Sequence, residues 1–170
     1  MSAPNATPPV VGVLALCRTG FERDCAQEIE QWLGERGADG YAQFEKLSGQ
    51  IIWFGTSPAW PKTQELVFAR QVIRLIQKRP LYFDAKDRIT PILSALEGQS
   101  YSAIYFDNPD TNDANSLSDL FHRIQKPLLS AAGKANILNR DAKQRVHLMF
   151  IDGTSAWLGI SEAGQTLKWP

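Results

Sequence analysis

The side chains best placed to do chemistry in this sequence are cations, and the chemistry open to them is the binding of phosphate groups. Arg123 and Lys126 lie three residues apart, with His122 beside them, in a segment whose other positions are apolar at helical spacing. Residues three and four apart share one face of a helix. The spacing therefore predicts a solvent-facing stripe of positive charge that can hold phosphates, arginine as a planar fork and lysine as a point charge.

Charge is segregated along the chain although the 18 Lys and Arg residues balance the 18 Asp and Glu residues. Residues 62–91 and 123–145 are rich in cations, whereas residues 92–122 contain acidic residues and no Lys or Arg. Two basic segments could converge into one patch on a neutral molecule. Charge alone leaves open that both are ordinary solvated faces. After Arg123 and Lys126, the next candidates for phosphate contacts are Arg88 and Arg145.

The sequence contains no pattern that predicts a catalytic centre. The glycines are dispersed at the expected ends of helices and strands, and none forms a dinucleotide-binding motif or a P-loop. His122 and His147 are the only histidines, and no serine or cysteine stands in a nucleophile-elbow context. We therefore expect both histidines to be structural or surface residues, and this chain by itself not to be an enzyme.

Metal and membrane binding are not indicated either. Asp107, Asp110 and Asp113 alternate like ligands but lack the glycine and the later glutamate of an EF-hand loop. Cys17 and Cys25 lack metal-ligand spacing, and we expect them to be reduced and partly buried. No stretch approaches the roughly 18 apolar residues of a membrane span. We expect a cytoplasmic protein with neither a metal nor a membrane partner.

The elements that would position these residues alternate between strands and helices. In the first half, Thr19 and Glu22 have the spacing of a capping box for a helix that ends at Gly34 or Gly37. The expected elements of this half are a disordered lead-in at residues 1–9, a strand at 10–17, that helix, and strands at 41–47 and 50–54 joined by a turn at 48–49.

Residues 66–78 are ambiguous, because their Val and Ile content favours a strand while their length and their Leu, Ala, Arg and Gln content suit a helix. Arg70, Arg74 and Lys78 are four apart, so they share a face in either case. Arg70 and Arg74 can bind phosphate or pair with acids inside the molecule. The order of elements resembles a small ferredoxin-like α+β sandwich.

The second half begins near Asp87. Thr90 and Pro91 have the types that start a helix, and Gly98 would end it. Apolar residues at helical spacing predict a longer helix from Leu117, which should kink or restart at Pro127 and end at Gly133. The remaining expected elements are a strand at 102–107 and a hairpin of strands 145–151 and 155–160 around a turn at 152–153.

Several short motifs resemble one known family. The segment from Cys17 to Ala26, Cys-Arg-Thr-Gly-Phe-Glu-Arg-Asp-Cys-Ala, followed by Glu28-Ile29, resembles the start of the RlmM family, which methylates a ribose of large-subunit ribosomal RNA. The matching motifs that follow, in the same order, are Phe68-Ala69-Arg70-Gln71, Asp87-Arg88-Ile89-Thr90-Pro91-Ile92, Asp110-Thr111-Asn112, Lys126-Pro127-Leu128, Val146-His147 with Phe150-Ile151, and Leu167-Lys168-Trp169-Pro170. The family commonly has proline where Thr19 stands. The resemblance covers residues 10–170.

The resemblance implies an α+β chain with a ferredoxin-like domain at residues 10–85 and a THUMP domain, an RNA-binding fold, at residues 86–170. It also implies a Rossmann-like domain that uses S-adenosylmethionine for 2'-O-ribose methylation of a 23S rRNA cytidine. We expect that domain in cis, outside this chain, so no cofactor is expected here.

The leading hypothesis is a module that binds ribosomal RNA and positions it for that catalytic domain. Thr111 and Asn112 could contact RNA, or shape the loop before the long helix. One rival is a stand-alone protein-interaction module. The other is a small acylphosphatase-like enzyme, whose phosphate-binding glycine loop Arg18-Thr19-Gly20 resembles only weakly.

Overall fold

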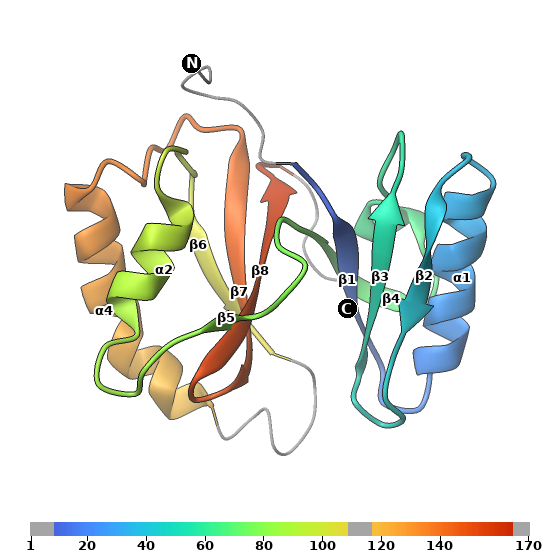
Figure 1. Cartoon of the computed structure of the whole chain (residues 1–170), viewed down its shortest axis with the longest axis horizontal. Coiled ribbons are helices and arrows are strands. Elements are labelled where there is room, and N and C mark those ends of the chain that lie inside the picture. The colour runs from blue at the N-terminus through green and yellow to red at the C-terminus, as the bar shows by residue number, and fades with distance from the viewer. Residues whose placement is uncertain (1–8, 109–116, 165–170) are drawn as a thin grey trace.

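The computed structural model describes residues 9–108 and 117–164, which fold around one continuous mixed sheet (Figure 1). Seven strands of the described residues run in the order β2-β3-β1-β4-β8-β7-β6, and the eighth, β5, pairs with β8 outside this path. The elements are β1 Gly12–Cys17, α1 Glu22–Gly34, β2 Asp39–Gln43, β3 Gln50–Thr56, the 3-10 helix η1 Thr63–Glu65, β4 Ala69–Leu75, β5 Leu81–Tyr82, α2 Ile89–Leu96, β6 Ile104–Asp107, α4 Ser118–Lys134, β7 Gln144–Asp152 and β8 Ser155–Glu162.

The first half has a ferredoxin-like arrangement. Strands β2, β3, β1 and β4 pair antiparallel in that order, and α1 makes the crossover from β1 to β2. The short η1 precedes β4, where a second long helix is usual in this fold. Residues 66–78 contain a strand, so the strand alternative for that ambiguous segment is confirmed.

The sheet has a helix-covered outer face and an inner face along which its two halves meet. Val13 and Ala15 of β1 pack under α1, and Val146 and Leu148 of β7 pack under α2 and α4. The paired residues Arg74 and Ile160 point to the same side, so all three helices cover one face. Figure 1 shows α1 and the pair α2 and α4 on opposite flanks of the molecule. The inner-face core contains Leu14, Leu16, Ile52, Ile73, Leu75, Met149 and Trp157.

The start of α1 differs from the prediction. The helix begins at Glu22 with Phe21 as its N-cap, so the predicted N-cap at Thr19 is wrong. The buried Glu22 carboxylate instead accepts hydrogen bonds from the amides of Gly20 and Leu47, both at 2.7 Å. It thereby fixes the β2–β3 loop against the β1–α1 turn. Leu47 is held there with a φ of 63°, a conformation that costs a non-glycine residue about 1 kcal/mol.

Strand β4 is irregular at Arg70, so the strict alternation on which the predicted common face of Arg70 and Arg74 rests is interrupted. The register between β1 and β4 skips Arg70, since Leu16 pairs with Gln71 and Cys17 with Ala69. A residue inserted in this way interrupts the two-residue alternation of a strand. Ala69 and Val72, three apart, consequently share the core beneath α1.

The second half follows its predicted order of elements, with local differences. Arg88 is the N-cap of α2 in place of the predicted Thr90, and the carboxylate of Asp87 before it accepts from the Thr90 amide at 3.1 Å. Hydrogen bonds from Thr90 lower the pKa of Asp87. Helix α4 continues through Pro127 without the restart that we allowed for. Its buried residues on both sides of the proline enter one core, and this packing offsets the missing backbone bond. Strand β5, which lies before the predicted domain boundary, pairs with β8.

Two glycines make room for a buried indole at the outer edge of the first half. A Cβ on Gly40 would lie 2.2 Å from the carbonyl oxygen of Phe54 and 2.4 Å from the Trp53 ring. A Cβ on Gly55 would lie 2.7 Å from the same ring. Trp53 is buried and meets Trp60 edge-to-face, with ring centroids 5.8 Å apart. The edge hairpin can therefore close over Trp53 only where both positions lack a side chain.

We predict that Gly40→Ala lowers the free energy of unfolding by about 1–3 kcal/mol, the usual cost of overpacking a core. Gly34→Ala is the matched control, because a Cβ there has open space within 4 Å and the residue ends a helix. We expect it to be neutral or slightly stabilising. Chemical denaturation of both variants checks this, and equal stability of the two would contradict the packing argument.

Candidate functional site

The predicted cationic stripe lies on the exposed side of α4. Arg123 and Lys126 are exposed, while Leu120, Ile124 and Leu128 on the opposite side of the helix are buried in the core. Neither cation forms an ion pair with another described residue. A shallow hollow next to them is lined by His122, Gln125, Lys126, Leu129 and Ser130. These side chains are therefore available to a ligand from solvent.

Arg88 is engaged inside the protein. Its Nε donates to the carbonyl oxygen of Gly153 at 2.7 Å, and its Nη1 donates to that of Ala85 at 3.0 Å. These two bonds tie the β7–β8 turn to the segment before α2. The turn itself is closed by Asp152, whose carboxylate accepts from the Thr154 amide, and hydrogen bonds from this residue lower the pKa of Asp152.

Arg74 lies at the joint between the two halves, and Arg70 lies near the start of β4. Arg74 is 3.8 Å from a carboxylate oxygen of Glu162, and its side chain is 17% exposed. Burial lowers the pKa of Arg74, and Glu162 opposes that effect. Arg70 is half-buried at the β4 irregularity. The other two predicted contacts, Thr111 and Asn112, lie outside the described residues.

Arg145 points away from the α4 stripe. It alternates with Val146, which faces α4, and therefore lies on the inner face of the sheet, where it is 9% exposed. Its Nε donates to the hydroxyl of Ser161 at 3.2 Å, and its guanidinium carbon lies 5.8 Å from the ring centre of Tyr105. The expectation that Arg145 joins Arg123 and Lys126 on one surface is wrong, because the sheet and its helix core lie between them.

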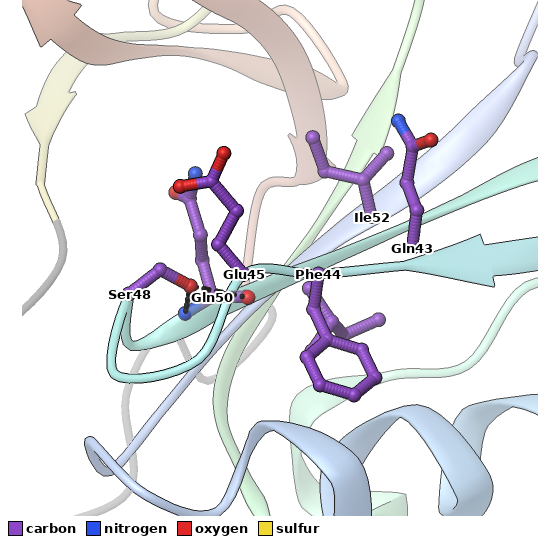
Figure 2. A pocket seen from close by; sticks show the side chains of 7 residues that line it. Gln43, Phe44, Glu45, Ser48, Gln50 and Ile52 are labelled. Carbon is purple, nitrogen blue, oxygen red and sulfur yellow. Dashed lines mark hydrogen bonds between the residues drawn. The ribbon is translucent and has the colours of Figure 1, made fainter.

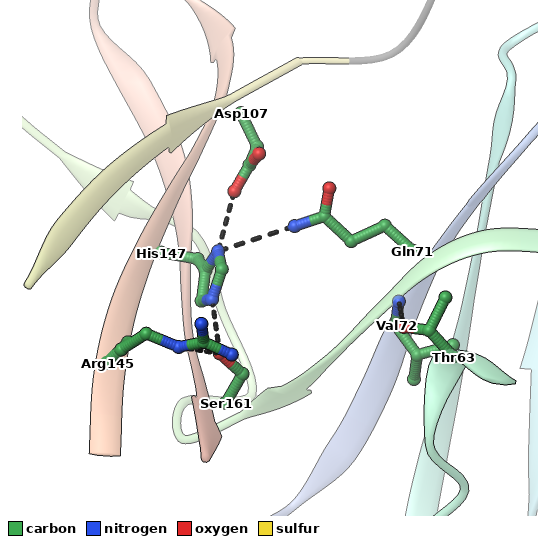
Figure 3. Close-up of polar contacts among 7 residues, drawn as sticks. All are labelled: Thr63, Gln71, Val72, Asp107, Arg145, His147 and Ser161. Carbon is green, nitrogen blue, oxygen red and sulfur yellow. Dashed lines mark hydrogen bonds and ion pairs between the residues drawn. The ribbon is translucent and has the colours of Figure 1, made fainter. Parts of the chain in front are cut away.

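A buried polar chain occupies this part of the inner face (Figure 3). His147 Nδ1 lies 2.7 Å from a carboxylate oxygen of Asp107, and its Nε2 lies 2.6 Å from the Ser161 hydroxyl. Parallel pairing of β6 with β7 sets His147 beside Tyr105, and antiparallel pairing of β7 with β8 sets Arg145 opposite Ser161. The chain is thus assembled by three adjacent strands.

The donors and acceptors of this chain fit one arrangement. Arg145 can only donate to Ser161, so the Ser161 hydroxyl can itself donate to His147 Nε2. The remaining ring proton, on Nδ1, then donates to the Asp107 carboxylate. Nε2 of Gln71 in β4 lies 3.4 Å from this Nδ1, and because both groups are donors in this arrangement the approach is a contact and not a hydrogen bond. A residue from the first half of the chain therefore contacts the polar chain of the second half.

Asp107, His147 and Ser161 are hydrogen-bonded in the same order as the catalytic triad of serine hydrolases, but the surroundings of Ser161 do not suit catalysis. Ser161 is 1% exposed, and its oxygen already accepts from Arg145. A substrate carbonyl could not approach it. The chain is a structural element that fixes the side chains of β6, β7 and β8. His147 was expected to be structural, whereas the roles of Tyr105, Ser161 and Gln71 were missed because they depend on strand pairing.

A second hollow lies beside the β2–β3 loop and has a volume of about 330 Å³. Figure 2 shows its lining, with Gln43 and Ile52 at one end and Ser48 at the other. Gln50 contributes a buried amide oxygen that has no partner among the described residues. The lining is mostly uncharged, so phosphate binding is not favoured there.

The described residues contain neither a metal-ligating cluster nor a membrane-spanning helix. Among residues 9–108 and 117–164, no group of three or more His, Cys, Asp or Glu side chains could hold a metal ion. No helix in those residues has the length and apolar character to cross a membrane.

Cys17 and Cys25 are buried free thiols. Their mutual hydrogen bond lowers the pKa of Cys17 and raises the pKa of Cys25.

Comparison with known proteins decides the family. Residues 10–73 match the model of the RlmM ferredoxin-like domain. Residues 87–162 match the model of the N-terminal region of ribosomal RNA large subunit methyltransferase M. The chain belongs to this methyltransferase M family. The two models cover both halves of the sheet, so the resemblance inferred from the short motifs is confirmed.

Relatives from this family match nearly the whole chain. The methyltransferase M of Thauera aminoaromatica is 34% identical over 98% of this chain and 49% of its own length. That of Stenotrophomonas maltophilia (strain K279a) is 32% identical over 94% of this chain and 47% of its own length. The chain thus spans about half the length of these relatives and corresponds to their N-terminal part. Similarity to the crystal structure of TrmN from Thermus thermophilus is distant, with 16% identity and a TM-score of 0.47 over 88% of this chain and 45% of that chain.

We predict that the two histidines of this methyltransferase M chain differ sharply in their effect on stability. His147→Ala removes the partner of two buried polar groups and leaves a cavity, so the free energy of unfolding should fall by about 3 kcal/mol or more. His122→Ala, on the exposed side of α4, should change it by less than about 0.5 kcal/mol. Denaturant titration measures both, and a mild effect of His147→Ala would contradict the structural role of the chain.

Proposed function

We propose that this chain is the RNA-binding N-terminal module of an S-adenosylmethionine-dependent methyltransferase that modifies a ribose of large-subunit ribosomal RNA. The observation that carries the proposal is the pair of exposed cations on α4, neither held in an ion pair by a described residue, in a chain of the methyltransferase M family. Phosphate contacts fix the register and orientation of a nucleic acid without reading its sequence. The module would hold RNA while another domain does the chemistry.

The family match supports a division between an RNA-binding half and a catalytic half. The matched relatives are about twice as long as this chain, and their names give ribosomal RNA as the substrate of a methyltransferase. Under this proposal the cofactor binds to the other half of such a protein, in cis, and ribosomal RNA is the partner of this half. The second half of the chain, from about residue 86, would be a THUMP domain next to the ferredoxin-like one. The proposal keeps the cytoplasmic location expected from the sequence.

The candidate contacts are not equivalent. Arg123 and Lys126 can bind phosphate without giving up an ion-pair partner among the described residues, which makes them the primary contacts. Arg88, Arg145 and Arg74 each already hold a hydrogen-bond or ion-pair partner, and binding RNA would cost them that interaction. Arg70, Thr111 and Asn112 remain secondary candidates.

The acylphosphatase-like alternative is disfavoured by one contact. A phosphate cradle at Arg18-Thr19-Gly20 needs free backbone amides, but the Gly20 amide donates to the Glu22 carboxylate at 2.7 Å. A buried anion at that place also repels a phosphate. The protein-interaction alternative differs in its dependence on salt, because only nucleic-acid binding releases counterions in proportion to the phosphates contacted.

We predict that Arg123→Glu with Lys126→Glu weakens binding to ribosomal RNA fragments by roughly tenfold or more near physiological salt, because two attractive charges next to phosphates become repulsive. The slope of log affinity against log salt should also become shallower, by about 0.7 for each phosphate of single-stranded RNA that is no longer neutralised. Filter binding or fluorescence anisotropy over a range of salt concentrations measures both quantities.

The matched control is Arg23→Glu with Lys46→Glu. It makes the same change in charge at exposed positions beside the first turn of α1, in the other half of the chain. Thermal unfolding should be nearly unchanged in both double variants, because all four side chains are exposed. An equal decrease of binding in the two would mean that overall charge, and not the α4 stripe, holds the RNA. Absence of RNA binding by the unaltered chain would refute the proposed function.

A further inference from the structure

Tyr105 is an exposed aromatic ring on the edge strand of the sheet. Strand β6 is the last strand of the sheet and pairs only with β7 among the described strands. Tyr105 points to the inner face, since its neighbours Ile104 and Phe106 pack into the helix-side core. Its residue is 37% exposed. The ring therefore offers a surface to solvent, whereas most other aromatic rings of the second half are in the core.

The side of the ring that faces the protein rests on a rigid support. The rings of Tyr105 and His147 are stacked, with centroids 5.4 Å apart and an angle of 21° between their planes. Both nitrogens of His147 are held, one by Asp107 and the other by Ser161. A ring bonded at both nitrogens and fully buried cannot rotate freely. The role of the buried polar chain is therefore structural, and it positions the ring of Tyr105.

The surroundings of the ring on the inner face are polar and include one cation. The guanidinium carbon of Arg145 lies 5.8 Å from the centre of the Tyr105 ring. The other side chains next to it on the inner face are His147, Asp107 and Ser161. These side chains are themselves almost fully buried, so a ligand meets chiefly the exposed face of the Tyr105 ring with the guanidinium beside it. A flat group attached to a phosphate complements that pair, by stacking on the ring and by attraction to the cation.

We propose that Tyr105 is a stacking platform for one unpaired base of the bound RNA. The buried Asp107–His147–Ser161 chain holds the ring in place, and Arg145 supplies positive charge at its rim. This inference rests on the proposed function and adds the kind of RNA that is recognised, a segment with an unstacked base. Stacking on an aromatic ring accepts any base and needs no hydrogen-bond pattern. A fixed ring loses little conformational entropy when a base stacks on it.

Binding of the chain to two probes tests this, an oligouridylate and a duplex RNA of similar length. We expect Tyr105→Leu to weaken oligouridylate binding by roughly 5-fold to 100-fold, the range typical of removing one base–aromatic stack, and to leave duplex binding unchanged. Tyr105→Phe should bind both probes like the parent chain. Tyr82→Leu is the matched control, because Tyr82 is also an exposed tyrosine on a short strand, at 69%, but has no stacked ring beneath it in the described structure.

Photo-crosslinking gives a measurement that does not depend on the folding of a variant. Oligouridylate carrying 5-iodouridine should crosslink to Tyr105 of the unaltered chain, as located by mass spectrometry. Crosslinks only to other residues, an equal decrease for both probes in Tyr105→Leu, or weaker binding in Tyr105→Phe would each overturn the stacking role. Each of these three results would leave the proposed RNA binding of the chain intact. Failure of the unaltered chain to bind either probe would overturn the proposed function as well.

Discussion

The pairing of β4 with β8 is the constraint on which the rest of this molecule depends. Only two residue pairs join these strands, Arg74 with Ile160 and Leu75 with Gly159. A Cβ on Gly159 would lie 2.9 Å from the carbonyl oxygen of Arg74 and 2.9 Å from the Ile73 side chain. The close approach is therefore possible because position 159 has no side chain. Through this joint a ferredoxin-like sheet and the sheet of the second half become one, and their inner faces bury a common core.

This joint gives the two faces of the sheet different roles. The outer face carries the helices, and α4 presents Arg123 and Lys126 to solvent. The inner face has an apolar core near the joint and, beyond it, the polar chain around His147 that Gln71 of β4 also reaches. Cations that look alike in the sequence consequently differ in what they can do. Those on α4 are available to a ligand, whereas Arg88, Arg145 and Arg74 already have partners within the protein.

The sequence predicts the elements better than it predicts the site, for a physical reason. Local patterns set the strand positions, the Asp152 turn and the amphipathic side of α4, because each depends on residues a few positions apart. Short motifs were enough to indicate the family. Contacts between distant residues carry no such pattern. Gln71 meets His147 across 76 positions and Arg88 meets Gly153 across 65, so their engagement could not be predicted. The contact of the Glu22 carboxylate with Leu47 was missed for the same reason, since it joins residues 25 positions apart.

In the mode of binding proposed for this chain, RNA is held by the exposed side of α4 and stacks on Tyr105 of the edge strand β6 beside Arg145, while Arg88 and Arg74 serve the fold. An NMR titration of the labelled chain with a ribosomal RNA fragment tests this most directly, because it reports every residue at once. We predict that amide shifts concentrate around Arg123 and Lys126 on α4 and around Tyr105 on β6. Shifts confined to the loops around Gly20 and Leu47, or to the Gly153 turn beside Arg88, would contradict this mode of binding.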